Sequence, residues 1–161
     1  MPSKLSIGLF SFTSCEGCFA NVLTLLDAEH EGILKVLDIK SAKLIQKKSS
    51  IEGLDVAFIE GSIATPKDEE KLKEIRANSK KLILLGTCAC DGWPSTQRNN
   101  FLQEQKNEIS AMVRRTGQLH EILTPEKIVK VDAKLIGCPI DNQAFKALLK
   151  ELFKEFGVEN A

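Results

Sequence analysis

Short apolar segments alternate with amphipathic ones along almost the whole chain, and this alternation limits the folds that the chain can adopt. The apolar segments expected to form strands are residues 5–12, 33–39, 54–59, 82–85 and 128–131. The segments between them place apolar residues at the spacing of one helix face. Strands that alternate with helices in this way form a parallel sheet covered by helices on both faces. The sequence therefore predicts an α/β fold with an open parallel sheet.

Helices are expected in four of the remaining segments. They begin near residues 15–18, at residue 66, near residue 101 and after residue 141. Thr65 can cap the second of these, which has a proline at its first position and Asp68 in its first turn. Asp141 can cap the last, which carries a long apolar stripe and which Gly157 can end.

Length and charge narrow the classes of protein that remain. The chain has 161 residues, so we expect one domain over residues 1–161, with residues 47–50 as a surface loop. Its 22 Lys and Arg residues balance 22 Asp and Glu residues, which argues against binding to nucleic acid. The uncharged run over residues 5–15 is too short to span a membrane, and no signal-cleavage site follows it. We therefore expect a cytoplasmic chain without a membrane span.

Five cysteines follow the predicted strands rather than lying inside strands or helices: Cys15, Cys18, Cys88, Cys90 and Cys138. In open α/β sheets, ligands bind beyond the carboxyl ends of the strands. All five cysteines are therefore expected at the same edge of the sheet, brought together from three loops. In a reducing compartment, such cysteines are more often metal ligands or redox groups than disulfides.

The residues around the cysteines favour thiolate ligands. Cys15 and Cys18 flank a helix start, where the helix dipole favours thiolate over thiol. Each cysteine loop also contains a glycine, which lets the backbone approach a bound group, or a proline, which restricts the residue before it. These residues are Gly17, Gly86, Gly137 and Pro139.

Thiolates from these loops could hold an iron–sulfur cluster or zinc. Structural zinc usually takes two close pairs of ligands, whereas Cys138 stands alone and Cys88 and Cys90 form a C-x-C pair. An iron–sulfur cluster therefore fits the spacing better. A redox dithiol at Cys15 and Cys18 would leave the other three cysteines unexplained, and a purely structural role is the remaining alternative.

Taken together, these motifs resemble the small subunit of nickel–iron hydrogenases and the homologous subunit of respiratory NADH:quinone oxidoreductase. The matching pieces are residues 13–18, 58–63, 86–89 and 137–141, in order along nearly the whole chain. The resemblance implies a flavodoxin-like domain that binds one proximal [4Fe–4S] cluster. Matched by position, the ligands would be Cys15, Cys18, Cys88 and Cys138. Cys90 matches no ligand and is expected to be a buried or free thiol, with a substitute for Cys88 as the alternative.

The C-x-x-C spacing at Cys15 and Cys18 resembles the hydrogenase branch, since the respiratory branch has adjacent cysteines there. With no export signal and no further cluster motifs, the chain looks like the short small subunit of a cytoplasmic, multisubunit [NiFe] hydrogenase, of the sulfhydrogenase delta or bidirectional NAD(P)-linked type. This resemblance implies an oxidoreductase subunit that is not active alone. It would pass electrons between the nickel–iron centre of a separate large subunit and a partner that carries flavin or further clusters.

Other residues near the cysteine loops are candidates for the surroundings of the cluster or for a subunit interface. Glu16 lies between the first two ligands and Glu60 ends the third strand, and each could instead be an ordinary loop carboxylate. Trp93 and Arg98 lie in a polar segment after the third ligand. Trp and Arg are typical interface anchors, with a plain surface loop as the alternative. Thr87 directly precedes the third ligand and belongs to the same group.

Three other functions remain open from the sequence alone. A flavin-binding module could cradle a phosphate at residues 11–14, but the cysteines in that loop count against it. A flavin elsewhere on the chain or at a subunit boundary stays an open alternative, although it is not the expected cofactor. A zinc-dependent scaffold domain and the small subunit of a respiratory-complex-type oxidoreductase are the others. The identity of the final electron partner is not encoded in these motifs.

Overall fold

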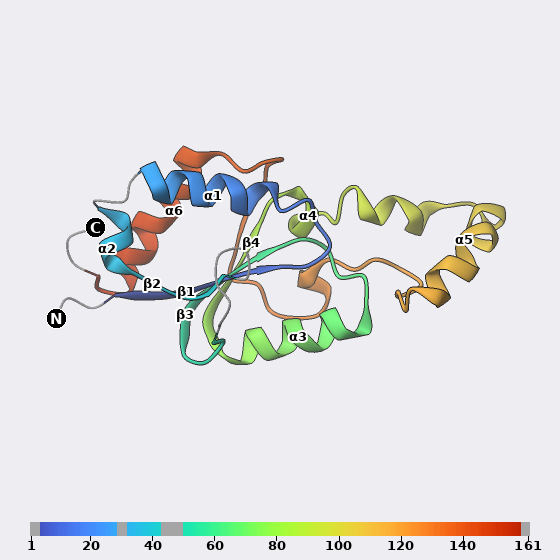
Figure 1. The fold of residues 1–161 in the computed structure, drawn as a ribbon, viewed down its shortest axis with the longest axis horizontal. Coiled ribbons are helices and arrows are strands. Elements are labelled where there is room, and N and C mark those ends of the chain that lie inside the picture. Colours follow the sequence, from blue (N-terminus) through green and yellow to red (C-terminus); the bar gives the residue numbers. More distant parts are fainter. Residues whose placement is uncertain (1–3, 29–31, 43–49, 159–161) are drawn as a thin grey trace.

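The computed structural model describes residues 4–28, 32–42 and 50–158, and these form one parallel sheet with helices on both faces (Figure 1). The strands are β1 (Leu5–Ser11), β2 (Leu37–Ala42), β3 (Leu54–Glu60), β4 (Ser79–Leu85) and β5 (Ala133–Leu135). Their order across the sheet is β2-β1-β3-β4-β5, and every pairing is parallel. This is the flavodoxin-like order, so the predicted fold class is confirmed.

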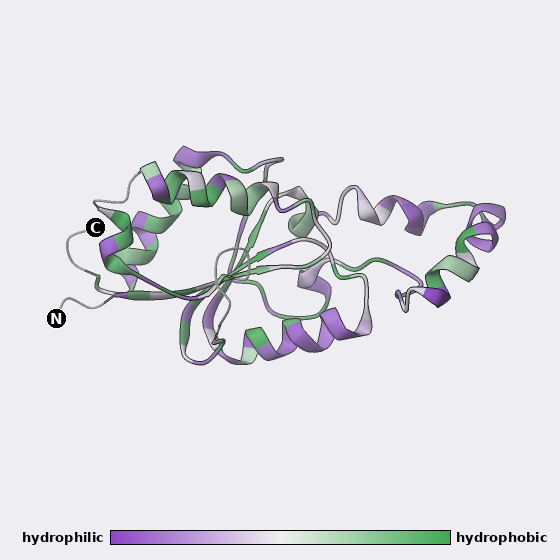
Figure 2. Ribbon diagram, in the orientation of Figure 1, coloured by the Kyte–Doolittle hydropathy of each residue, from purple (hydrophilic) through white to green (hydrophobic). Residues whose placement is uncertain are grey.

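The described residues form six helices. They are α1 (Gly17–Ala28), α2 (Ile33–Val36), α3 (Pro66–Ala77), α4 (Thr87–Cys90), α5 (Gln103–Arg115) and α6 (Asn142–Glu155), with short 3-10 turns η1 (Ser95–Asn100) and η2 (Pro125–Lys127). Helices α1 and α6 lie side by side over one face, while α3 covers the other (Figure 1). Apolar side chains of the strands enter both layers and form two core clusters, one with α1 and α6 and one with α3. In Figure 2, hydrophilic and hydrophobic residues are mixed along α3 and α6, as expected for helices with one face on the sheet.

The predicted helix ends are confirmed where capping signals are strong. Thr65 accepts a hydrogen bond from the Asp68 backbone N–H, and the Asp68 carboxylate accepts one from the Thr65 N–H, which is a reciprocal capping box. Asp141 accepts from the Ala144 N–H at the start of α6. Gly157 follows α6 with a φ of 65°, a left-handed conformation that ends helices.

Two strand predictions were wrong in position. Residues 33–36 form α2, and the strand begins only at Leu37, since a short apolar run does not distinguish a buried helix from a buried strand. Residues 128–131 are not a strand, and the edge strand is the shorter β5. Ile128, Val129 and Val131 instead pack as a partly buried loop against the core cluster beneath α3. The predicted loop at residues 47–50 lies almost wholly outside the described residues.

Residues 93–122 extend away from the sheet and contain η1 and α5 (Figure 1). We call this segment the arm. Its return path is fixed to the sheet by backbone hydrogen bonds: the Leu119 N–H donates to the Ala64 carbonyl, and Ile63 and Leu123 exchange two such bonds. The arm therefore leaves and rejoins the sheet at the edge where the cysteines lie. None of the helices formed by the described residues has the length and apolar character of a membrane-spanning helix.

Candidate metal centre

Backbone hydrogen bonds join the loops that carry Cys88 and Cys138. The Gly86 N–H donates to the Leu135 carbonyl over 2.8 Å, and the Thr87 N–H donates to the Gly137 carbonyl over 2.9 Å. The Thr87 hydroxyl donates to the same Gly137 oxygen over 3.1 Å. These bonds continue the β4–β5 pairing past the strand ends, so the two loops leave the sheet together.

At Gly86, the loop that carries Cys15 and Cys18 approaches the loops that carry Cys88 and Cys138. Its φ is 84°, and a Cβ atom there would lie 2.5 Å from the Cys18 sulfur and 3.5 Å from the Gly137 oxygen. A side chain at residue 86 would therefore collide with a proposed ligand. Gly17 makes a looser approach, since its Cβ would lie 3.3 Å from the Cys15 sulfur.

The electrostatic coupling of the thiols indicates that four of them lie together. The pKa of Cys18 is raised to about 11, mainly by burial and to a smaller extent by the charges of Glu60, Cys88 and Cys138, while a backbone hydrogen bond from Ile140 lowers it. Burial also raises the pKa of Cys88, with added contributions from Cys15 and Cys138. Thiolates this close repel one another, and an iron centre would relieve that repulsion by holding them deprotonated.

The four thiols differ in their access to solvent. Cys18 is buried, Cys88 is half-buried, and Cys15 and Cys138 are exposed. All are free thiols. Among the described residues, no three His, Cys, Asp or Glu side chains are grouped closely enough to hold a single metal ion. Thiolate sulfurs are ligands that both iron–sulfur clusters and zinc accept.

Cys90 occupies a different environment from the other four. It is buried in the core cluster beneath α3, and its sulfur lies 3.9 Å from the Leu135 carbonyl oxygen. Cys18 belongs to the cluster on the opposite face. The pKa of Cys90 is raised to about 11, mainly by burial and to a smaller extent by the charge of Asp91. These surroundings suit a neutral buried thiol.

Glu60 lies at the carboxyl end of β3 and is 1% exposed. Its two carboxylate oxygens accept hydrogen bonds from the backbone N–H groups of Cys18 and Phe19, over 3.2 and 3.1 Å. Burial raises the pKa of Glu60, these two bonds lower it, and the charge of Glu16 raises it. Glu60 therefore caps α1 directly beneath the first cysteine loop. Glu16 itself is exposed and has a φ of 60°.

Asn21 is a site residue that sequence reasoning missed. Its side-chain amide donates to the Ile140 carbonyl over 2.8 Å and so ties α1 to the loop of Cys138. A hydrogen bond from the Ile140 backbone N–H to the Cys18 sulfur lowers the pKa of that thiol. The available signal was a polar side chain between the apolar residues Phe19 and Val22 of α1. The Cys138–Pro139 peptide bond of this loop is cis.

Trp93 and Arg98 have different surroundings. Trp93 is 54% exposed, at the base of the arm close to α4. Arg98 uses its guanidinium inside the chain, where it donates to the Gln118 side chain and to the Leu119 carbonyl. Burial lowers the pKa of Arg98. Trp93 is therefore open to solvent, whereas Arg98 holds the arm together.

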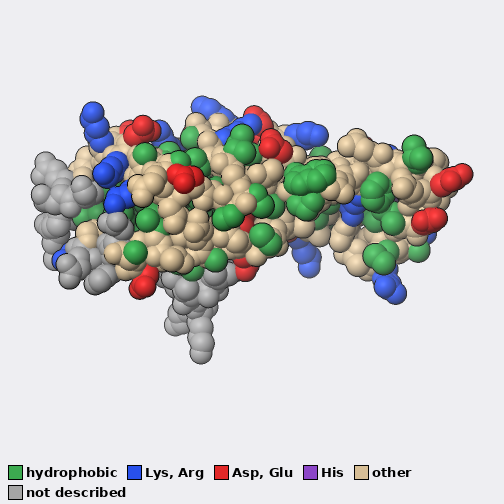
Figure 3. All heavy atoms as spheres, turned by 90° about the horizontal axis from the view of Figure 1, so that it is seen from above, with side chains coloured by type: hydrophobic (Ala, Val, Ile, Leu, Met, Phe, Trp, Pro, Cys, Tyr) green, Lys and Arg blue, Asp and Glu red, His purple; other side chains and the backbone are tan. Residues whose placement is uncertain are grey.

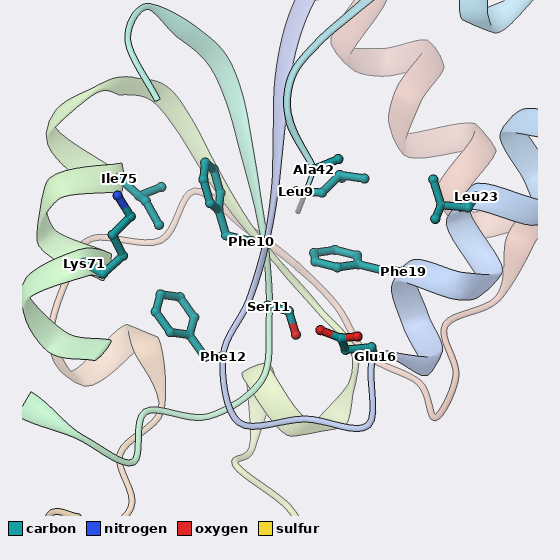
Figure 4. Close-up of a pocket in the computed structure, with 10 residues that line it drawn as sticks. All are labelled: Leu9, Phe10, Ser11, Phe12, Glu16, Phe19, Leu23, Ala42, Lys71 and Ile75. Carbon is teal, nitrogen blue, oxygen red and sulfur yellow. The ribbon is translucent and has the colours of Figure 1, made fainter. Parts of the chain in front are cut away.

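An apolar pocket lies beside the site, between α1 and α3 at the carboxyl end of β1 (Figure 4). Phe10, Phe12 and Phe19 line it, and Ser11 and Glu16 point toward each other at its end. Within the described part of the chain, no cysteine lines this pocket. It is thus a neighbour of the cysteine site rather than a part of it.

Comparison with known proteins places this geometry in a family context. The family described as NADH ubiquinone oxidoreductase, 20 Kd subunit, matches residues 15–152. The sulfhydrogenase 2 subunit delta of Pyrococcus furiosus is 31% identical over 96% of this chain and 64% of its own length. The HoxS subunit delta of the NAD-reducing hydrogenase of Cupriavidus necator is 24% identical over 92% of this chain and 78% of its own length.

Among solved structures, a chain of an NAD+-reducing [NiFe]-hydrogenase in the H2-reduced state superimposes with a TM-score of 0.76. The two chains are 25% identical, and the match covers 98% of this chain and 94% of that one. The chain spans just under two-thirds of the length of the Pyrococcus relative. The fold is therefore shared with a chain of a solved [NiFe]-hydrogenase.

Proposed function

The chain belongs to the NADH ubiquinone oxidoreductase, 20 Kd subunit, family, and we propose that it is the electron-transfer small subunit of a cytoplasmic [NiFe] hydrogenase. It would hold one proximal [4Fe–4S] cluster through Cys15, Cys18, Cys88 and Cys138. The observation that carries this proposal is the convergence of these four thiols at one edge of the sheet, from three loops that contact one another. The names of the relatives support the hydrogenase branch of the family.

The residues of the chain suit this role by their placement. When bound, a [4Fe–4S] cluster would supply one-electron transfer, with no bond made to a substrate. Gly86 leaves room for the Cys18 sulfur, and the bonds of Thr87 to Gly137 hold two ligand loops in a fixed relation. The buried Cys18 and the exposed Cys138 give the site one protected side and one open side.

We propose that the open side faces a hydrogenase large subunit that carries the nickel–iron centre. Cys15 and Cys138 are exposed there, and Ile136, two residues before Cys138, is 60% exposed. An exposed large apolar residue beside exposed ligands suits a surface that another protein covers. A second partner, with flavin or further clusters, would exchange electrons with the site. Free thiols as ligands suit the reducing cytoplasm.

The contacts of the first loop weigh against a flavin phosphate at residues 11–14. The N–H groups at the start of α1 that would bind a phosphate donate to Glu60 instead. The Ser14 hydroxyl is also engaged, since it accepts from the Glu16 N–H over 3.2 Å and lies 3.1 Å from the Ser11 hydroxyl. The cysteine site is therefore the better-supported redox centre.

The proposal is tested by iron analysis of the chain purified without oxygen together with its co-purifying subunits. About four irons per chain and broad absorption at the blue end of the visible range are expected. Cys138→Ser should lose most of the iron, whereas the matched control Cys90→Ser should keep it. A colourless chain with one zinc would overturn the proposal, and equal iron loss in both variants would overturn the ligand assignment.

A further inference from the structure

Glu60 is the buried acid of the cysteine site. We propose that Glu60 positions the first cysteine loop and lowers the reduction potential of the group that the cysteines hold. This inference rests on the proposed function, because it concerns a cluster bound by Cys15, Cys18, Cys88 and Cys138.

The position of Glu60 in the sheet brings it between the cysteine loops. In the strand register, Glu60 pairs with Ser11 on one side and with Leu85 on the other. The first of these neighbours leads into the loop of Cys15, and the second leads into the loop of Cys88. The Glu60 carbonyl also accepts a hydrogen bond from the Phe12 N–H over 2.8 Å. The residue is thus joined to the first loop by its backbone as well as by its side chain.

The Glu60 side chain accepts hydrogen bonds from N–H groups at the start of α1 that have no partner within the helix. The first N–H groups of a helix have no partner within the helix and carry its positive dipole end. At α1, the N–H groups of Cys18 and Phe19 both donate to the Glu60 carboxylate. Because Cys18 and Phe19 are 6% and 3% exposed, water cannot replace this partner easily. Glu60 therefore fixes the backbone of the first loop at the residue that carries the buried thiol.

The same arrangement makes the addition of an electron less favourable. Net charge, hydrogen bonds to the cluster sulfurs and exposure to solvent are among the features that set the reduction potential of a cluster. Glu60 places a carboxylate, both of whose oxygens accept hydrogen bonds, in a buried position beside Cys18. The carboxylate contacts the Cys18 backbone, and Glu60 pairs in the sheet with Leu85, which leads into the loop of Cys88. A negative charge in this position would oppose the addition of an electron to a cluster that these loops hold.

The test is a redox titration, followed by electron paramagnetic resonance, of the complex that contains the full chain. Glu60→Gln removes the charge and turns an N–H donor toward one of the two backbone donors. The reduction equilibrium constant should rise about tenfold, which is about 59 mV upward for a one-electron couple. The matched control is Asp55→Asn. Asp55 is an acid on the same strand that accepts from the Ser6 N–H and pairs with Lys80, so its loss should leave the potential unchanged.

Iron content separates this inference from the proposed function. If wild-type protein lacks the cluster, the proposed function fails. If Glu60→Gln keeps about four irons per chain and its potential is unchanged or lower, the inference is overturned and the proposed function stands. Should the Gln variant not assemble, Glu60→Asp carries the test, since it keeps the charge on a shorter side chain. Its equilibrium constant should stay within about threefold of wild type, and a tenfold rise would overturn the inference.

Discussion

Helices α5 and α6 are nearly equal in length and both amphipathic, yet the molecule uses them in opposite ways. α6 has 14 residues and buries Phe145, Leu149, Leu152 and Phe153 against the sheet. α5 has 13 residues and buries Val113 alone. Met112 on α5 is 61% exposed, and Leu102, the residue that directly precedes this helix, is 73% exposed. An apolar stripe on a helix therefore does not by itself say where that stripe is covered.

The two regions are also held together by different forces. The sheet and its helices rely on apolar burial, with residues from β1, β3 and β4 almost fully enclosed. The arm relies on polar contacts: Arg98 bonds to Gln118 and Leu119, while the Asn99 side chain exchanges two hydrogen bonds of 2.8 Å with the Ile122 backbone. Figure 3 shows apolar side chains at the surface of the arm, among acidic and basic ones. The buried core of the sheet region thus stabilises the fold, whereas the arm exposes apolar side chains at the surface of the protein.

The largest effect on stability is expected from Phe145→Ala. Phe145 is 1% exposed, and its ring packs edge-on against Phe58 with centroids 5.5 Å apart. Removing it leaves a cavity between α6 and the sheet, which should lower the free energy of unfolding by about 3–5 kcal/mol. Denaturant unfolding of the metal-free chain measures this. A loss below about 1 kcal/mol would contradict the assignment of stability to the sheet region.

The difference between these regions also explains what sequence reasoning could reach in the fold. Strands buried on both faces, such as β3 and β4, have continuous apolar runs. The predicted β3 ends one residue early, and the predicted β4 misses the three polar residues at its start. The edge strand β5 consists of Ala133, Lys134 and Leu135, none of them fully buried, so it gives a weak signal. The fifth strand is instead predicted at residues 128–131, because this run is more apolar, although it packs as a loop.

In the candidate site, the rule that ligands follow parallel strands was enough to predict one edge for the cysteine loops. The contacts that shape the site could not be predicted in this way. Glu60 meets Cys18 across 42 positions of the chain, and Asn21 meets Ile140 across 119. Such pairs depend on how helices are set onto the sheet, which local patterns do not encode. The metal identity and the role of each cysteine stay predictions.

A smaller and local effect is expected from Arg98→Ala. This change leaves the Leu119 carbonyl and the Gln118 side chain without their guanidinium donors, at a cost of about 1–3 kcal/mol. Because the arm is tied by polar contacts, hydrogen exchange should speed up at Leu119 and Ile122 while the sheet amides stay protected. Arg115→Ala, at the exposed end of α5, is the matched control and should change neither. Faster exchange throughout β3 and β4 in Arg98→Ala would mean that arm and sheet unfold as one unit.

The smallest effect on stability is expected from Met112→Ala, and this variant sharpens the contrast most. Met112 is 61% exposed on α5, so its loss should change the free energy of unfolding by no more than about 0.5 kcal/mol. If the arm supplies contact surface, the same change should weaken binding of a co-purifying subunit several-fold, because an exposed methionine becomes buried only in the complex. Unfolding of the isolated chain and a binding titration with the purified partner measure the two quantities separately.

Unchanged affinity would remove α5 from the interface and leave its apolar stripe without a role in assembly. A loss of stability above about 1 kcal/mol would instead show that α5 packs against the rest of the chain more closely than its exposure indicates.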